Sequence, residues 1–177
     1  MIYTPREDSY LLEEQVKKYA KNKKVIDIGS GTGIQAQAAL QAGAISVLAS
    51  DINKESIALL KSKNIPAIIS NLFQKIKGEF DLIIFNPPYL PEDKLEPQDS
   101  KKATTGGEKG DEILLKFLKQ AKKHLEKNGI ILLAISSLTP QDKILNIIHK
   151  NNFSYKVISR KSFFMETLEV WEIQRDS

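Results

Sequence analysis

The sequence predicts an α/β fold in which helices cover both faces of a doubly wound, mostly parallel sheet. Short runs rich in Ile, Leu and Val alternate with helix-length segments, and strands that are buried on both faces have this composition. Such alternation predicts parallel strands joined by right-handed crossover helices. The chain has 177 residues, which fits one ordinary domain, and we expect that domain to span residues 1–177.

Seven strands are expected in the sheet. Apolar runs predict five of them, at residues 25–28, 45–49, 67–69, 81–85 and 130–135. Two more runs, at residues 155–159 and 167–173, follow one another without a full helix between them and therefore predict a hairpin. Its second strand should be antiparallel to its neighbours and should place Trp171 in the core. The expected fold is thus a Rossmann-like seven-stranded sheet, mostly parallel, with an antiparallel C-terminal strand.

Helical patterns lie between the expected strands. They predict helices at residues 34–42, 54–63 and 111–127, and another after Pro140 that ends near residue 150. A further helix is expected near the start, where Thr4 at the N-cap, Pro5 at N1 and Glu7 at N3 form a capping box. A contact with a ligand is an equally good reading of this first segment.

Composition excludes several classes of protein. The chain has no Cys and only two histidines, His124 and His149, which excludes a disulfide framework, a thiol nucleophile and a Cys-ligated zinc site. Both histidines are expected on helix surfaces, and two alone do not form a metal site. No apolar run approaches the roughly 18–20 residues that cross a bilayer, and the first ten residues are polar and acidic rather than signal-like. We therefore expect a cytoplasmic protein without a metal.

The net charge of +4 comes mainly from lysines that are spread over several segments. A single basic stripe would indicate a nucleic-acid footprint, whereas scattered lysines are more typical of a solvated surface. Nucleic acid therefore stays possible as a partner but is not favoured.

Residues 89–110 interrupt the strand–helix alternation. They are rich in Pro, Gly, Lys and acidic residues and show no periodicity. Irregular loops longer than about 12–15 residues are uncommon in compact domains and are usually functional or disordered. This segment follows a buried strand at the carboxyl edge of the sheet, where open α/β sheets bind ligands, so we expect it to be a substrate loop.

A glycine-rich loop joins the first strand to the next helix and reads Asp27-Ile28-Gly29-Ser30-Gly31-Thr32-Gly33. Glycines let the backbone turn tightly and approach a ligand, and the helix N-terminus offers free N–H groups. The spacing is Gly-x-Gly-x-Gly and not the Gly-x-Gly-x-x-Gly of dinucleotide sites. Asp27 would repel a diphosphate and attract an ammonium group, which favours a ligand with an ammonium group over a purely structural turn.

Asp51 ends the second strand, about twenty residues beyond the glycine loop, where an acidic residue suits a ribose diol. Its alternative role is to cap the helix that opens near Asn53. Asp51 occurs together with the glycine loop in this sequence, so ribose binding is the better interpretation.

The tetrapeptide Asn86-Pro87-Pro88-Tyr89 ends the fourth strand. Two prolines could simply terminate a strand. They also fix the backbone so that the Asn86 side-chain oxygen and the Pro87 carbonyl can converge on one planar amino group, on which Tyr89 can stack. Two such acceptors localise the nitrogen lone pair for attack on an alkyl group, and no strong base is needed.

Together these features resemble the class I S-adenosylmethionine-dependent methyltransferases that act on planar amino groups. The closer resemblance is to the HemK/PrmC family of release-factor glutamine methyltransferases, in its short archaeal and eukaryotic branch. The Pro-x-Glu-Asp-Ser and Gly-Gly-x-x-Gly motifs make this branch more specific than the glycine loop alone. The matching segments cover nearly the whole chain, at residues 3–9, 27–33, 51–53, 71–72, 86–89, 106–110 and 166–168.

The resemblance implies a role for each matching residue. Cofactor-binding residues would be Ser9, Asp27, Gly29, Gly31, Gly33, Asp51, Asn71, Leu72 and Asn86. Of these, Asn71 and Leu72 would frame the adenine; many relatives carry Asp at the position of Asn71, and a neutral amide accepts hydrogen bonds more weakly than a carboxylate. Catalytic residues would be Asn86, Pro87 and Tyr89, and the acceptor would also contact Pro88, Gly106 and Gly107.

The implied reaction is methylation of the glutamine side-chain amide in the Gly-Gly-Gln motif of a class 1 peptide release factor. Catalysis would rest on positioning and on the two acceptors at Asn86 and Pro87. Short-branch relatives also work with a small zinc-binding activator protein that adds a strand to the sheet edge. The implied edge is Ala67 to Ile69, which Ile65, Ile68 and Ile69 make apolar.

Two alternatives stay open at the level of sequence. The Asn-Pro-Pro-Tyr tetrapeptide suits an exocyclic amine of adenine or guanine in DNA or RNA equally well, although enzymes of that kind usually carry an added recognition domain. A nucleotide-sensing module without catalysis would explain the glycine loop and Asp51 but would leave Asn86 to Tyr89 without a purpose.

Overall fold

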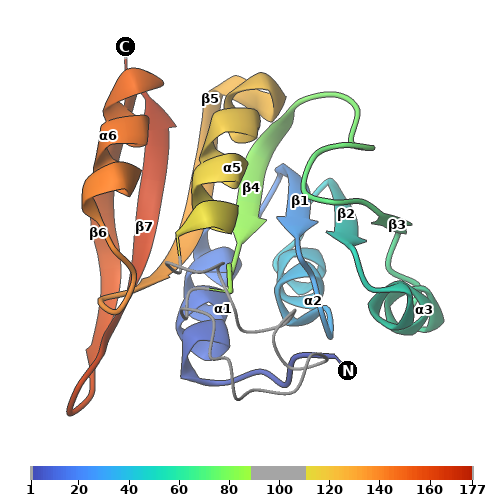
Figure 1. Cartoon of the computed structure of the whole chain (residues 1–177). Coiled ribbons are helices and arrows are strands. Elements are labelled where there is room, and N and C mark those ends of the chain that lie inside the picture. Colours follow the sequence, from blue (N-terminus) through green and yellow to red (C-terminus); the bar gives the residue numbers. More distant parts are fainter. Residues whose placement is uncertain (1, 89–110, 177) are drawn as a thin grey trace.

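The computed structural model describes residues 2–88 and 111–176. Its strands form one seven-stranded sheet with helices on both faces (Figure 1). The strands are β1 (Lys24–Ile28), β2 (Ser46–Asp51), β3 (Ala67–Ile69), β4 (Phe80–Phe85), β5 (Leu125–Ser136), β6 (Phe153–Ser162) and β7 (Thr167–Arg175). The helices are α1 (Glu7–Tyr19), α2 (Ile34–Gln41), α3 (Lys54–Ser62), α5 (Glu112–Ala121) and α6 (Asp142–Lys150), with a 3-10 turn η1 (Lys122–His124).

The strand order is β3-β2-β1-β4-β5-β7-β6. β1 pairs in parallel with β2 on one side and β4 on the other, so the direction of winding reverses between β1 and β4. β7 follows β6 in the chain but lies between β5 and β6 and is antiparallel to both. The predicted doubly wound sheet with an antiparallel strand in its closing hairpin is confirmed.

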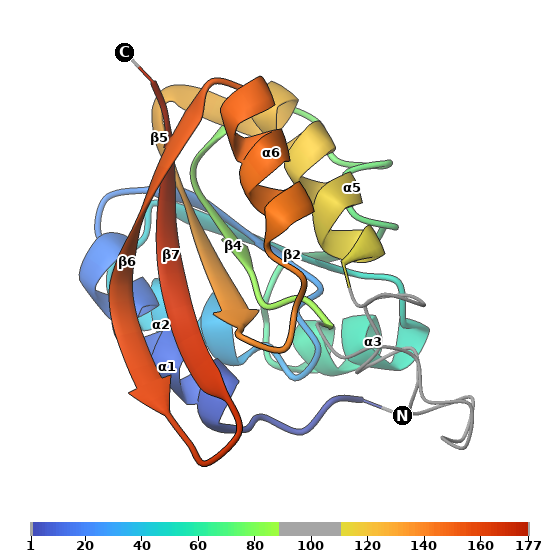
Figure 2. The ribbon, with the colours of Figure 1, turned by 60° about the vertical axis from the view of Figure 1, so that its left-hand side comes forward.

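Two apolar cores lie on opposite faces of the sheet because successive strand residues point to opposite sides. In β4, Ile83 and Phe85 pack in the core beneath α5 and α6, whereas Leu82 and Ile84 pack in the core beneath α1, α2 and α3. Figures 1 and 2 show these two helical layers with the sheet between them. Trp171 in β7 is fully buried, as predicted.

The helix predicted at residues 111–127 is shorter than expected. It ends at Ala121, and residues 125–127 begin β5, with Leu125 paired to Phe80 of β4. The Arg175 guanidinium donates a hydrogen bond to the carbonyl oxygen of Lys122 at 2.7 Å, just where the α-helical pattern stops. Tertiary pairing with β4 and β7 therefore overrides the helical propensity of this lysine-rich stretch.

The predicted capping box at Thr4 is wrong. The N-cap of α1 is Arg6, so the helix begins at Glu7 and places Ser9 at N3, where the Ser9 hydroxyl accepts a hydrogen bond from the Arg6 N–H at 3.5 Å. The Tyr3 hydroxyl donates to the Asp8 carboxylate at 3.1 Å, which ties the segment before α1 to the first turn of the helix.

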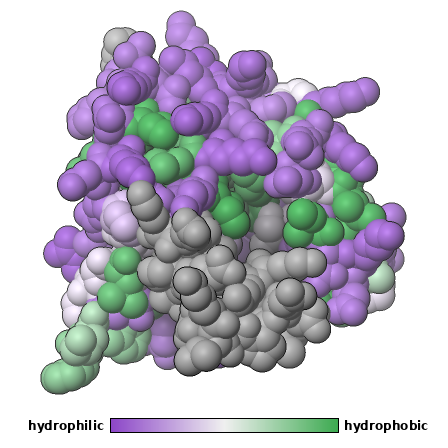
Figure 3. Space-filling model, viewed as in Figure 1, coloured by the Kyte–Doolittle hydropathy of each residue, from purple (hydrophilic) through white to green (hydrophobic). Residues whose placement is uncertain are grey.

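Hydrophilic side chains cover most of the molecular face above α5 and α6 (Figure 3), in line with the solvated lysines that the sequence predicts. An apolar projection lies where the β6–β7 hairpin ends, and Phe164 there is 99% exposed. Within the described ranges, no helix is both long enough and apolar enough to cross a membrane.

Candidate functional site

A cavity of about 1040 Å³ opens at the carboxyl ends of β1, β2 and β4, where the winding of the sheet reverses. Open α/β sheets bind ligands at this position. The glycine loop, the ends of β2 and β4, the segment before α1 and the start of β7 form its walls. Most of the predicted site residues line it, namely Ser9, Asp27, Gly29, Gly31, Asp51, Asn71, Leu72, Asn86, Pro87 and Pro88. The predicted residues Tyr89, Gly106 and Gly107 lie outside the described ranges.

The glycine loop turns through three residues of left-handed backbone, with φ of 66° at Gly29, 53° at Gly31 and 86° at Gly33. Gly33 is the N-cap of α2 and does not line the cavity. A Cβ atom at Gly33 would lie 2.5 Å from Cδ2 of Leu60, which is fully buried in α3. Gly33 thus allows the start of α2 to lie close to Leu60 of α3, and its role as a ligand contact stays a prediction.

Asp27 is 1% exposed, and its Oδ2 atom has no hydrogen-bond partner among the described residues. The pKa of the Asp27 carboxyl is raised to about 7, mainly by burial and to a smaller extent by the Asp51 charge, although hydrogen bonds from Ser30 and the Ala36 backbone act to lower it. An unpaired buried carboxylate oxygen on a cavity wall calls for a cationic donor. This fits the ammonium group of S-adenosylmethionine, as the sequence predicts.

Gln35 in the first turn of α2 is a lining residue that the sequence reasoning missed. Its Nε2 donates to the backbone oxygen of Ser9 at 2.9 Å, and its buried Oε1 has no partner within the described part of the chain. This oxygen and Oδ2 of Asp27 are two buried acceptors on one cavity. No motif marks Gln35, because only the tertiary approach of α1 to α2 shows where it points.

Asp51 accepts two backbone hydrogen bonds, from the Gly31 N–H to Oδ2 and from the Asn53 N–H to Oδ1, both at 2.8 Å. The N-cap of α3 is Asn53, whose Oδ1 accepts from the Glu55 N–H at 2.8 Å. Asp51 is therefore not the helix cap, which removes the alternative considered above. A carboxylate has about four acceptor positions, so Asp51 can orient the glycine loop and still accept hydrogen bonds from a ribose diol.

The expected adenine-binding residues lie directly after β3. Asn71 is exposed and Leu72 half-buried, and both line the cavity. Leu72 has a left-handed backbone with φ of 50°, and its carbonyl oxygen accepts a hydrogen bond from Ser70 Oγ at 2.8 Å. The turn thus presents an apolar side chain and an amide at one wall, which suits a flat heterocycle.

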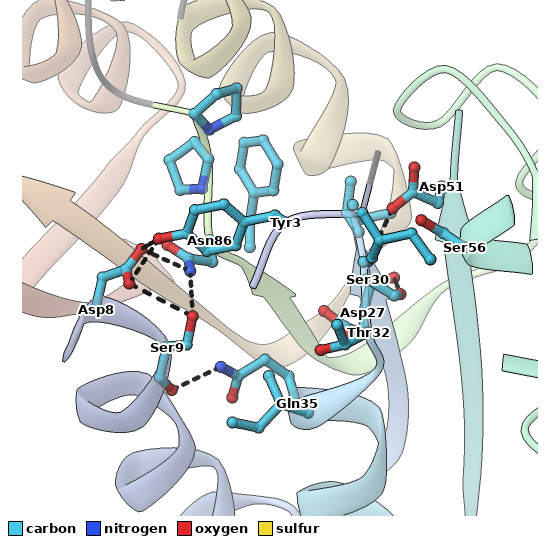
Figure 4. Close-up of a pocket in the computed structure, with 18 of the residues that line it drawn as sticks. Tyr3, Asp8, Ser9, Asp27, Ser30, Thr32, Gln35, Asp51, Ser56 and Asn86 are labelled. Carbon is cyan, nitrogen blue, oxygen red and sulfur yellow. Dashed lines mark hydrogen bonds between the residues drawn. The ribbon is translucent and has the colours of Figure 1, made fainter. Parts of the chain in front are cut away.

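Asn86 directly follows β4 and points at the start of α1 (Figure 4). Its Nδ2 donates to Asp8 Oδ2 at 3.0 Å and lies 3.4 Å from Ser9 Oγ. Its Oδ1 is buried and has no partner among residues 2–88 and 111–176. The Tyr3 hydroxyl also donates to Asp8, and burial, followed by the Asp8 charge, raises the pKa of Tyr3 so that it stays a donor.

The late segment at residues 166–168 also reaches the cavity, through Glu166 and Leu168. Ser136 Oγ at the end of β5 donates to Glu166 Oε1 at 2.6 Å and fixes that carboxylate.

His124 and His149 do not line the cavity. His124 stacks on Phe73 and bonds the Gly78 carbonyl oxygen at 2.9 Å. In the ranges that the structure describes, no cluster of His, Asp and Glu could hold a metal ion.

Comparison with known families identifies the family to which a chain with this site belongs. The family model described as the methyltransferase small domain matches residues 7–164. The chain belongs to this family. S-adenosylmethionine is the cofactor of this methyltransferase, and the predicted family resemblance is confirmed.

Two relatives and one solved structure illustrate the match. This methyltransferase is 36% identical over 177 residues to a Methanocaldococcus jannaschii protein provisionally named a protein N5-glutamine methyltransferase, covering 96% of this chain and 89% of that one. It is 30% identical over 153 residues to the release factor glutamine methyltransferase of Aquifex aeolicus, covering 76% of this chain and only 54% of that longer protein. The E. cuniculi Mtq2-Trm112 complex, described as responsible for methylating the eRF1 translation termination factor, superposes with a TM-score of 0.81 at 20% identity over 99% of both chains.

Proposed function

We propose that this methyltransferase methylates the glutamine side-chain amide in the Gly-Gly-Gln motif of a class 1 peptide release factor. The observation that carries the proposal is the buried Oδ1 of Asn86 on the cavity wall, which has no hydrogen-bond partner among the described residues. A buried acceptor without a donor costs free energy that a ligand N–H group can recover, and a primary amide offers two N–H groups. The names of the Methanocaldococcus jannaschii and Aquifex aeolicus relatives support the same acceptor.

S-adenosylmethionine would occupy the cavity along the sheet edge. Asp27 and Gly29 would hold its methionine end together with Gln35, Asp51 would hold the ribose, and Asn71 with Leu72 would frame the adenine. When bound, this cofactor supplies a methyl group on a positively charged sulfur. Asp27 Oδ2 and Gln35 Oε1, which have no partner in the described part of the chain, support this orientation because both can accept from an ammonium group.

The protein would contribute positioning and two hydrogen-bond acceptors. Asn86 Oδ1 and the Pro87 carbonyl oxygen would each accept one proton of the acceptor amide, which localises the nitrogen lone pair. The nitrogen would lose one of these protons to solvent as, or after, it gains its new bond to carbon. Asn86 is fixed by Asp8 and Ser9 before any acceptor binds, and such preorganisation reduces the cost of reaching the reactive geometry.

Replacing Asn86 by Ala tests the proposal. The Asn86→Ala variant should lose at least about a hundredfold in turnover, since one of two preorganised acceptors is gone, while it still binds S-adenosylmethionine in calorimetry. Mass spectrometry of co-expressed release factor should show one added methyl on the glutamine with the natural chain and none with the variant. Methylation of DNA or RNA oligonucleotides in place of the release factor would contradict the proposed acceptor, and undiminished activity of Asn86→Ala would contradict the mechanism.

We propose that residues 1–177 act as one domain in the cytoplasm, where the proposed acceptor works, with residues 89–110 as the substrate loop. Tyr89 would stack on the acceptor amide, and Gly106 and Gly107 would receive its glycine-rich motif. Pro88, which lines the cavity beside Asn86, would form the rim that the acceptor crosses.

We further propose a small zinc-binding activator protein that adds a strand beside β3. β3 is an edge strand of the sheet, and Ile69 on it is 38% exposed. The apolar surface at this edge is smaller than the sequence predicts, because Ile65 is 2% exposed and belongs to the core beneath α3. The name of the E. cuniculi complex supports a small partner for proteins of this fold.

A further inference from the structure

We propose that Asp8 is a positioning residue that selects the reactive orientation of the Asn86 side chain. This inference rests on the proposed amide methylation, in which Asn86 Oδ1 must face the acceptor nitrogen. Asp8 touches neither the acceptor nor the reacting carbon in this scheme; it acts through Asn86.

The Asp8 carboxylate is buried and surrounded by hydrogen-bond donors. Asp8 is 4% exposed and is the second residue of α1. Three groups donate or can donate to its carboxylate: the Tyr3 hydroxyl at 3.1 Å from Oδ1 and 3.2 Å from Oδ2, Ser9 Oγ at 3.4 Å from Oδ1, and Asn86 Nδ2 at 3.0 Å from Oδ2. Figure 4 shows Tyr3, Ser9 and Asn86 gathered around Asp8 at one end of the cavity.

An asparagine side chain can rotate by half a turn, which exchanges its oxygen and its nitrogen at almost the same positions. An ionised carboxylate only accepts hydrogen bonds. If Asn86 were rotated, its Oδ1 would face Asp8 Oδ2 at hydrogen-bond distance with no proton between them. Asp8 therefore excludes the rotated state and leaves Oδ1 directed away from α1, which is the atom without a partner among the described residues.

Its surroundings favour this orienting role over that of a base. A base must have a free lone pair that faces the proton it removes, whereas Tyr3, Ser9 and Asn86 already occupy most of the acceptor positions of the Asp8 carboxylate. The first-turn position in α1 also favours a negative charge, because the free N–H groups of the helix N-terminus lie nearby. Asp8 is thus held in one position between the helix and Asn86.

The Asp8→Asn variant removes the constraint with little change in volume. An amide at this position can donate or accept, so both orientations of Asn86 become populated. Asn86 Oδ1 then faces the nitrogen of the glutamine amide for a smaller fraction of the time. We expect kcat to fall by about tenfold to a hundredfold, with the KM for release factor and the Kd for S-adenosylmethionine within about threefold of the natural values. The Asp8→Glu variant keeps the carboxylate and should recover part of kcat.

The matched control is Glu13→Gln, the same chemical change on the same helix, at a residue that pairs with Lys17 and does not line the cavity. This control should leave kcat unchanged. A second readout is the NMR signal of the Asn86 side-chain NH2 in the chain with S-adenosylmethionine but without acceptor. In the natural chain its protons should exchange slowly and with distinct shifts, and Asp8→Asn should remove that protection.

An unchanged Asn86 NH2 signal in folded Asp8→Asn overturns the inference, whether kcat falls or not. A lost turnover with an unchanged signal would identify Asp8 as a base instead. A natural chain that methylates no release factor would contradict the proposed function alone, because the NMR readout needs no acceptor.

Discussion

Burial disfavours the charged form of Asp27, and the same unfavourable burial suits this carboxylate to bind a cationic ligand group. The carboxyl is buried, and Oδ2 has no donor within the described chain. Its pKa of about 7 lies far above the usual 3.8, so the folded chain binds a proton there that the unfolded chain releases. A cationic ligand group would reverse this penalty, and binding sites commonly combine function with local instability in this way.

Asp27→Asn should therefore stabilise the ligand-free chain at high pH. Between pH 3.8 and about 7 the folded state holds more protons than the unfolded state, so the free energy of unfolding falls as pH rises through this window. Asn cannot ionise and avoids a loss on the order of ~4 kcal/mol, given 1.36 kcal/mol for each pH unit. Urea unfolding should show the variant clearly more stable than the natural chain at pH 8 and nearly equal to it at pH 4.

The same variant should bind S-adenosylmethionine at least about tenfold more weakly, because it lacks the charge that pairs with the ammonium group. Calorimetry at pH 8 measures this directly. A variant that is no more stable at pH 8, or that keeps full affinity, would contradict the role of Asp27.

At this scale the sequence could predict residues that belong to motifs and little else. Asp27, Asp51 and Asn86 lie at or just after the carboxyl ends of β1, β2 and β4 and so meet at one edge of the sheet, and all three line the cavity. Gln35 and Asp8 could not be assigned because their roles depend on the approach of α1 to α2 and to the end of β4. At Gly33 the structure adds what the motif does not show, a close approach to Leu60 of α3 that only glycine allows.

At the scale of elements, the glycine loop and α3 form one packed unit. Gly31 and Gly33 both have left-handed backbone, but a Cβ on Gly31 would meet nothing within 4 Å, whereas a Cβ on Gly33 would overlap Leu60. The loop is thus constrained on its helix side and open on its cavity side.

These two glycines give a matched pair of variants. Gly31→Ala should cost about 1 kcal/mol of unfolding free energy from backbone strain alone, and Gly33→Ala about 2–4 kcal/mol because strain and overpacking add. Urea unfolding of the ligand-free chain checks both values. Equal losses would show that α3 shifts freely and that the close approach to Leu60 imposes no constraint.

Elements with strong periodicity were predicted well, and the errors lie at their ends. Residues 67–69 were predicted as a strand and match β3 as observed, and the helices at 34–42 and 54–63 are each one residue shorter than predicted. The helix at 111–127 overran because pairing of Leu125 with Phe80 is a tertiary contact that local sequence does not show. The start of α1 moved for a similar reason, since Tyr3 bonds Asp8.

At the scale of the whole molecule, the sheet has a free edge at β3. Ala49 N–H donates to the Pro66 carbonyl oxygen at 2.8 Å and Ser70 N–H donates to the Asp51 carbonyl oxygen at 3.0 Å. Backbone groups alternate in direction along a strand. The backbone groups of residues 66, 68 and 70 therefore face β2, while the N–H groups of Ala67 and Ile69 face outward. An added strand would bond to these outward groups.

Ile69→Pro should separate the proposed small partner from this chain. Proline removes the outward N–H of Ile69 but leaves the bonds to β2, and it is tolerated on an edge strand. Ile69→Val keeps the N–H and serves as the matched control. Size-exclusion chromatography of the co-expressed pair should show a complex with Ile69→Val and the natural chain, and none with Ile69→Pro; a complex with all three would rule out strand addition at this edge.

The placement of β7 between β5 and β6 affects how the protein is made in the cell. The ribosome synthesises β5 and β6 before β7. The position between these two strands in the sheet therefore stays unoccupied until residues 167–175 emerge. During that interval β5 has β4 on one side only, and the nascent chain exposes the other edge of an apolar strand, Ile131 to Ile135, whose side chains are buried in the finished protein. We expect this stage, and not the earlier parallel strands, to be the one at which chaperones protect the chain from aggregation.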